Sequence, residues 1–577
     1  MVRRGMALLG LLALLLVAFA LYAGWQAWQV RNHLQAAEQH VQVLRTALDG
    51  VDEEAADEAG TDLAREARAA AERTEGMVWG VLTAAPVWGD DAVGVRALAR
   101  SLDDLASGAV EPLRRTSELV GAVHSDDGID LEVVRDLQTP VGVAHAAASR
   151  ASDEVADVDT DGFAAPLKSR YEEYVDAVDD IASGLGSART AVSLLPSMLG
   201  GDGPRRYLLV FQNNAEIRGS GGLPGSFAEV VAESGRLQML SQGTGEEMGR
   251  RTPPLATSPA EQAVYGARLG ATFTDATSSP HFPRAAALMR QRWEERHPGR
   301  RLDGVVAIDP VALSYLLAGT GPVTVADTTI TADNAAATLL HRAYVELPES
   351  AQDAYFQQAA RAIFDAGTRD LADPMEFARG LTRAAREDRL LVSSVHAAEQ
   401  RTIDGTSAAG LLTQDDGATP HVDVSLDDRT GAKMSYFLRY DADVRATSCE
   451  GDRQVLTGSM TLSQDIDPAV AATLPTYVTG SGVSGVQPGL QSVSVHLHGP
   501  HGGTVDDVRV DGREATPLTV VDLDGRPVAS QSVLLGGEDV VVEWRMSTGP
   551  GQTGDGLLGL TPGVLPGDND ERFASSC

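Results

Sequence analysis

The spacing of hydrophobic residues divides the chain into four regions. Residues 5–30 are apolar and uncharged, and residues 31–199 place hydrophobic side chains three and four positions apart, as amphipathic helices do. Residues 200–415 combine short apolar runs with helical periodicity, whereas residues 421–577 alternate apolar and polar positions between Gly, Asp and Pro turns. The pattern predicts a multidomain protein with an N-terminal membrane helix (residues 1–30), a helical bundle or stalk, a central α/β domain and a C-terminal β-sandwich-like domain.

The N-terminal apolar segment is long enough to cross a bilayer, for which roughly 20 residues suffice. Arg3 and Arg4 precede it, and a strongly acidic chain follows it. This order predicts a cytoplasmic N-terminus and an extracytoplasmic remainder. The letters AFA at residues 18–20 resemble a signal-peptidase site, so a cleaved signal is the alternative. We expect an uncleaved anchor because the apolar run continues past this site to Trp25 and Trp28.

The α/β domain is predicted to open with two strands, at residues 207–211 and 227–231. Residues 302–308 read as a buried strand, which Asp309 ends as a helix cap with Pro310 in the first helical position. Further helices are expected at residues 331–340, 351–366 and 374–386, and a last strand at residues 390–394.

The predicted loop between the first two strands is the main candidate for a binding site. It holds more glycines and hydrogen-bonding side chains than a hairpin needs. Glycines let backbone N–H groups approach an anion closely, and a guanidinium adds a charged fork. The predicted ligand-binding residues are Asn213, Asn214, Arg218, Gly221, Gly222 and Ser226. The alternative is an elaborate turn whose Asn side chains bond their own backbone.

Charge and cysteine content limit the partners and the compartment. The 577-residue chain has 47 basic and 81 acidic residues, a net charge of −34, which argues against nucleic acid as a partner. Its two cysteines, Cys449 and Cys577, are predicted to form a disulfide in an oxidising compartment, with two unrelated thiols as the alternative.

Histidines and lysines give weaker signals. His496, His498 and His501 lie close together, but we expect an exposed strand end rather than a metal site, because no carboxylate or Cys joins them at close spacing. Lys433 is one of two lysines in a chain that otherwise uses arginine, so it is a candidate for a position that needs a compact ammonium. A chance surface lysine is the alternative.

Three motifs identify the chain as similar to the bacterial envelope family known as domain of unknown function 4012. They are YLLVFQNNAEIRGSGGLPGSF from residue 207, LDGVVAIDPVALSYLLAGTGPV from residue 302 and GAKMSYFL from residue 431. The order of elements also resembles that of the LytR-CpsA-Psr envelope phosphotransferases. That resemblance implies Mg²⁺, aspartates and several arginines around the pyrophosphate of a polyprenyl-linked glycan.

The residues match that phosphotransferase pattern only in part. Arg218 stands where one such arginine is expected, and Asp275 is the candidate carboxylate, so these two are the candidate catalytic residues. The paired Arg-Asp expected after residue 240 is absent, and other arginines can be placed only by order: Arg250, Arg251, Arg342 and Arg361.

Two functions are therefore expected. The first is a membrane-anchored extracytoplasmic envelope protein that binds or transfers a phosphorylated or polyprenyl-linked glycan, with Mg²⁺ needed only for phosphotransfer. The alternative is a non-catalytic envelope scaffold in which the same loop is structural.

Overall fold

The computed structural model describes two compact units. The first contains Met1–Val123 and Glu132–Leu195, and the second contains His124–Leu131 and Pro196–Cys577. The described residues are 2–49, 53–86, 88–125, 128–156, 158–369, 371–515, 518–567 and 570–577, and within the first helix the described side chains are those of residues 18–44.

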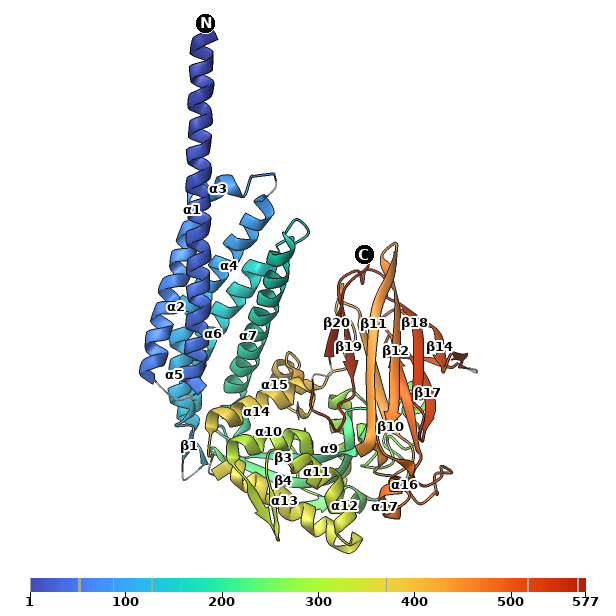
Figure 1. Cartoon of the computed structure of the whole chain (residues 1–577). Coiled ribbons are helices and arrows are strands. Elements are labelled where there is room, and N and C mark those ends of the chain that lie inside the picture. Colours follow the sequence, from blue (N-terminus) through green and yellow to red (C-terminus); the bar gives the residue numbers. More distant parts are fainter. Residues whose placement is uncertain are drawn as a thin grey trace. The chain divides into compact units, whose positions relative to one another are not determined.

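The first unit is helical, as the periodicity predicts (Figure 1). Its helices are α1 (Val2–Asp49), α2 (Glu53–Thr74), α3 (Met77–Leu82), α4 (Gly89–Gly108), α5 (Val110–Val120), α6 (Leu131–Ala156) and most of α7 (Ala165–Met198). They pack through small side chains, because Ala37, Ala67 and Ala106 form one buried cluster with Leu63. The breaks expected at Gly60 and Pro140 are wrong, since α2 and α6 run through them.

In the part of the chain whose residues are described, no helix is both long enough and apolar enough to cross a membrane. The predicted anchor at residues 5–30 lies partly outside the described side chains, so it stays a prediction.

The second unit contains a five-stranded sheet with helices on both faces. Its strands, in spatial order, are β5 (Arg236–Thr244), β4 (Gly221–Glu233), β3 (Arg205–Arg218), β6 (Gly304–Ile308) and β9 (Leu390–Ser394). Only β3 and β6 pair in parallel. Successive side chains of a strand face opposite ways. Leu208 and Val210 accordingly enter the core formed with α9 (Phe282–Arg296), whereas Phe211 packs on the cluster that includes α10 (Pro310–Thr320) and α13 (Glu349–Arg369).

The end of β6 and the start of α10 follow the sequence prediction closely. Asp309 is the N-cap of α10, and its carboxylate accepts a hydrogen bond from the Ala312 N–H at 2.7 Å. α14 (Pro374–Arg386) and β9 also form where the sequence predicts them. The helix expected at residues 331–340 is instead broken into α11 (Ala335–Ala337), a π-helical turn (Thr338–Arg342) and α12 (Ala343–Glu346).

The C-terminal part of this unit consists of two sheets that share one hydrophobic core. One has the order β16, β17, β13, β10, β19, β20 and the other β11, β12, β18, β14, β15. Side chains from both sheets, among them Val424, Val495 and Trp544, pack in that core, as the period-two alternation predicts. The bounds are β10 (His421–Asp428), β11 (Leu438–Glu450), β12 (Arg453–Gln464), β13 (Gln491–His498), β14 (Thr504–Val510), β15 (Arg513–Glu514), β16 (Val520–Leu523), β17 (Arg526–Leu535), β18 (Val540–Ser547), β19 (Gly556–Leu560) and β20 (Asp570–Phe573).

A disulfide closes the C-terminal end of the chain. Cys449 and Cys577 are bonded, with their Cα atoms 5.0 Å apart and 128 positions between them in the sequence. The predicted pairing is confirmed, and it attaches the last residue to the end of β11.

One buried arginine joins the sheet with α helices to the C-terminal segment. Arg389, just before β9, is 1% exposed and lies between two carboxylates: Nη1 is 2.9 Å from Asp309 Oδ2, and Nε is 2.9 Å from Glu387 Oε2. It also donates hydrogen bonds to the carbonyl oxygens of Gly563 and Leu565, beyond β19. Burial raises the pKa of Asp309, and the Arg389 guanidinium opposes that rise. We call these residues the Arg389 cluster.

Replacing Arg389 with Met is expected to lower the free energy of unfolding by about 3–5 kcal/mol, because two buried carboxylates lose their cation. Urea denaturation followed by circular dichroism measures this loss. Arg386→Met, at an exposed position of α14, is the control and should change the free energy by less than about 0.5 kcal/mol. Equal stability of the two variants would contradict the role given to Arg389.

Removing the disulfide by the double substitution Cys449→Ser and Cys577→Ser is expected to lower the free energy of unfolding by about 2–4 kcal/mol, because a long loop is no longer closed in the unfolded chain. The same urea titration measures it, and the wild-type protein in reducing agent should match the double variant. A wild-type protein that loses no stability on reduction would contradict this expectation.

Candidate functional site

A large pocket opens in the second unit, beside the ends of β3 and β4. Its volume is 1220 Å³. The lining comes from β3, β4, α10, α13, the π-helical turn and α12, and from the segments that follow β10 and α17 (Thr476–Thr479). Pockets of this size hold small organic ligands.

One side of the pocket is apolar. One face of α13 supplies Phe356, Ala359, Ala360 and Ile363, which recur at the three- and four-residue spacing of a helix face. The same side is completed by Phe211, Pro310, Leu313, Leu339 and Leu340. This side suits a ligand part that has no hydrogen-bonding groups.

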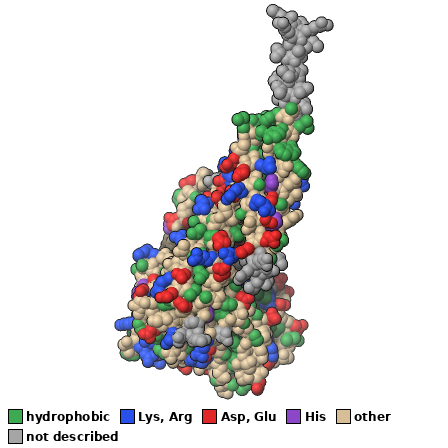
Figure 2. Space-filling view, turned by 90° about the vertical axis from the view of Figure 1, so that its left-hand side faces the viewer, with side chains coloured by type: hydrophobic (Ala, Val, Ile, Leu, Met, Phe, Trp, Pro, Cys, Tyr) green, Lys and Arg blue, Asp and Glu red, His purple; other side chains and the backbone are tan. Residues whose placement is uncertain are grey.

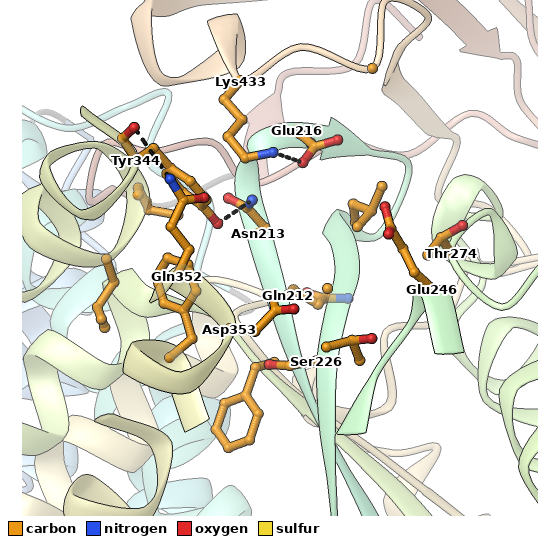
Figure 3. A pocket seen from close by; sticks show the side chains of 18 of the residues that line it. Gln212, Asn213, Glu216, Ser226, Glu246, Thr274, Tyr344, Gln352, Asp353 and Lys433 are labelled. Atoms are coloured by element: carbon orange, nitrogen blue, oxygen red, sulfur yellow. Dashed lines mark hydrogen bonds and ion pairs between the residues drawn. The ribbon is translucent and has the colours of Figure 1, made fainter. Parts of the chain in front are cut away.

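The opposite side carries amides, hydroxyls and one buried ion pair (Figure 3). Lys433 Nζ lies 2.7 Å from Glu216 Oε1 and stands over the rings of Tyr344 and Tyr477, 4.8 and 4.0 Å from their centroids. Asn213 Nδ2 donates to the Tyr344 hydroxyl at 3.0 Å. Burial alone lowers the pKa of Lys433, but the Glu216 carboxylate and the two phenols more than offset it, so the pKa lies above its ordinary value.

The charges of the lining are mostly paired inside the protein. The lining has four basic residues (Arg218, Arg268, Arg429 and Lys433) and six acidic ones (Glu216, Glu246, Asp275, Glu349, Asp353 and Asp428). Arg268 Nε is 2.8 Å from Asp275 Oδ2, and Lys433 is held by Glu216. The lining is therefore net acidic, and its cations already have carboxylate partners, apart from the exposed Arg429, whose Nε lies 3.2 Å from Ser494 Oγ.

Arg218 is 6% exposed and is directed into the protein. Its Nη1 donates to the carbonyl oxygens of Ile217 at 3.0 Å and Asp428 at 2.8 Å, and Nε is 4.0 Å from the Asp427 carboxylate. Burial lowers the pKa of Arg218, but Asp427 and Asp428 raise it above its ordinary value. This guanidinium therefore holds β3 against β10.

The structure separates the six predicted ligand-binding residues into two groups. Asn213, Arg218 and Ser226 line the pocket, as does the candidate carboxylate Asp275. Asn214 does not line it, because its Nδ2 donates to Asp309 Oδ2 at 2.9 Å in the Arg389 cluster. The six do not form one anion cradle.

Gly221 and Gly222 serve the hairpin. Gly221 has φ +117°, and a Cβ on Gly222 would lie 2.5 Å from the Asn213 carbonyl carbon. The expected loop over residues 212–226 is wrong: β3 continues to Arg218 and β4 begins at Gly221. The polar residues of β3 are buried because they face the C-terminal sheets, as Ile217 N–H does in donating to Ser435 Oγ at 3.2 Å.

The other candidate cations lie outside the pocket lining. Arg251 pairs with Glu295 at 3.0 Å, Arg342 with Glu346 at 3.1 Å, and Arg361 donates to the Met239 carbonyl oxygen at 3.4 Å. Arg250 forms a β-bridge with Thr272.

The histidines form no metal centre. His496 and His498 are 1% and 0% exposed and pack beside Tyr265, so the expected exposed strand end is wrong for these two. Burial holds the pKa of His498 well below its ordinary value. Within the described residues, no group of three His, Cys, Asp or Glu side chains is arranged to hold a metal ion.

Sequence reasoning missed the face of α13 and the two tyrosines around Lys433. The recurrence of Phe356, Ala360 and Ile363 was readable as a helix face, but nothing in the sequence shows that part of it faces a cavity. The rarity of lysine did point to Lys433.

Comparisons with known proteins add a family and little else. No curated protein matches the chain. Among solved structures, the X-ray structure of the Lin1025 protein from Listeria innocua aligns at 10% identity over 38% of this chain and 85% of that chain, with a TM-score of 0.21, too low to support an argument. The resemblance to the LytR-CpsA-Psr phosphotransferases is not shown by these comparisons. Residues 202–344 match a family described as a protein of unknown function (DUF4012), so the chain carries the domain that its Asn- and Gly-rich motif predicts.

Proposed function

We propose that the protein is a membrane-anchored, extracytoplasmic binding protein for a glycan that carries an apolar chain. The observation that carries this proposal is the division of the 1220 Å³ pocket into an apolar side and a side of amides, hydroxyls and aromatic rings. An apolar chain fits the first side, and sugar hydroxyls fit the second.

The polar side has the groups that bind a sugar. Tyr344 and Tyr477 offer aromatic rings, and Gln212, Asn213 and Ser226 offer hydrogen-bond donors and acceptors. Asn213 and Tyr344 are already joined by a hydrogen bond, which holds both side chains in place before a ligand binds.

The charge of the lining favours an uncharged glycan over a phosphorylated one. Six carboxylates outnumber four cations there, and Arg218, Arg268 and Lys433 are engaged by acidic groups of the protein. A phosphate would have to displace one of these partners, at a cost in binding free energy. Phosphotransfer, with Arg218 and Asp275 as catalytic residues and Mg²⁺ as cofactor, is therefore not part of the proposal.

Two features support the location. The disulfide between Cys449 and Cys577 fits an oxidising compartment outside the cytoplasm. Near the N-terminus, α1 exposes Phe19, Leu21, Tyr22, Trp25 and Trp28, and Figure 2 shows hydrophobic side chains gathered there. Exposed Trp and Tyr at the end of an apolar segment are typical of a membrane interface.

The proposal predicts that affinity for n-alkyl β-glucosides rises with chain length. If the chain enters the apolar side, each added methylene contributes up to about 0.8 kcal/mol, so octyl glucoside should bind about tenfold more tightly than hexyl glucoside. Isothermal titration calorimetry below the micelle concentration measures both, with glucose and octyl phosphate as comparisons. Affinity that is independent of chain length, or binding of octyl phosphate alone, would overturn the proposal.

A matched pair of variants on α13 tests the location of binding. Ala360→Leu narrows the apolar side and is expected to weaken octyl glucoside binding about tenfold, whereas Ala354→Leu, at an exposed position outside the lining, leaves it unchanged. Thermal denaturation of both variants checks that each is folded. Equal binding by the two folded variants would place the ligand elsewhere.

A further inference from the structure

Two carboxylates of the pocket differ from the others in having no partner. Asp353 on α13 and Glu246, directly after β5, are exposed and line the pocket. Neither forms a hydrogen bond or an ion pair with another residue of the described structure. Figure 3 shows both side chains within the pocket, on separate elements.

The inner carboxylates of the same pocket are satisfied. Glu216 holds Lys433 at 2.7 Å, Asp275 holds Arg268 at 2.8 Å, and Asp428 Oδ2 accepts from Gln491 Nε2 at 2.8 Å. Glu349 is also unpaired by a cation, but it lies in the first turn of α13, where the helix dipole favours an acidic residue. Asp353 and Glu246 have no such structural explanation.

A buried amide in the same pocket also lacks a partner. Gln212 is 2% exposed and lines the pocket, and its Nε2 forms no hydrogen bond in the described structure. A buried donor without an acceptor is costly, so most such groups in proteins are paired. A sugar hydroxyl or ring oxygen would supply the acceptor that Nε2 needs.

We infer that the ligand is an amino sugar with a free, protonated amino group, which lies between the carboxylates of Asp353 and Glu246 while a ring oxygen accepts from Gln212. This inference rests on the proposed function, because the sugar is the polar part of the ligand proposed above. The amine supplies the positive charge that the acidic lining lacks. An acetylated amine carries no charge and gains nothing from these carboxylates.

The expected gain is modest because both carboxylates are exposed. Octyl 2-amino-2-deoxyglucoside should bind about fivefold to tenfold more tightly than octyl glucoside, as one or two exposed ion pairs allow. Its N-acetyl form should show no such gain. The preference should shrink as sodium chloride is added, because salt screens exposed charges.

Calorimetry at about pH 6, where a sugar amine is protonated, compares the three glucosides on the full chain and on two double variants. Asp353→Asn with Glu246→Gln should abolish the preference for the amine and keep the binding of octyl glucoside. The control, Asp333→Asn with Glu538→Gln, removes two exposed carboxylates outside the lining and should keep the preference.

The outcomes separate this inference from the proposed function. Equal binding of the amine and the hydroxyl compound, or a preference that survives in the Asp353 and Glu246 variant, overturns the inference and leaves the glycan pocket standing. Absence of binding by all three glucosides overturns the proposed function and the inference with it.

Discussion

The second unit depends on a buried arginine that lies between two carboxylates. Arg389 is fully enclosed, and such a cation is tolerated only when its charge and its donors are all met. Asp309 and Glu387 meet the charge, and carbonyl oxygens beyond β19 accept from Nη1 and Nη2. Because Asp309 also caps α10 and holds Asn214, the same cluster fixes a helix that walls the pocket and the end of the strand that floors it.

The pocket follows from this arrangement of packed parts. Its floor comes from β3 and β4, its apolar side from α10 and α13, and its rim from segments of the C-terminal sheets that carry Lys433 and Tyr477. Lys433 joins two of these parts, because its ammonium contacts Glu216 of β3 and the ring of Tyr344 in α12. The site is thus built at the place where three structural layers meet, which is a common location for ligand pockets.

The sequence predicts elements well wherever side-chain pattern and burial agree. The strand before Asp309, its cap, α14 and β9 all follow from local pattern, because apolar runs there enter a core and the polar ends face outward. The second half of β3 breaks this agreement. Gln212, Asn214 and Glu216 read as a loop, yet they are buried strand residues whose partners lie 95 or more positions away, as for Asn214 with Asp309 and Lys433 with Glu216. No local pattern encodes such contacts, so the site could be located near this motif but its chemistry could not.

β3 belongs to two hydrophobic cores. Leu208 and Val210 pack in the core beneath the α/β sheet, and Ile217 of the same strand packs in the core between the C-terminal sheets. A gene fragment that ends with the family match at residue 344 would strip Ile217, Arg218 and Asn214 of their surroundings and omit β9 altogether. Evolution therefore could not have shuffled this region between proteins as a free-standing cassette; where the motif is inherited with this strand, the sheets that enclose its far end must be inherited along with it.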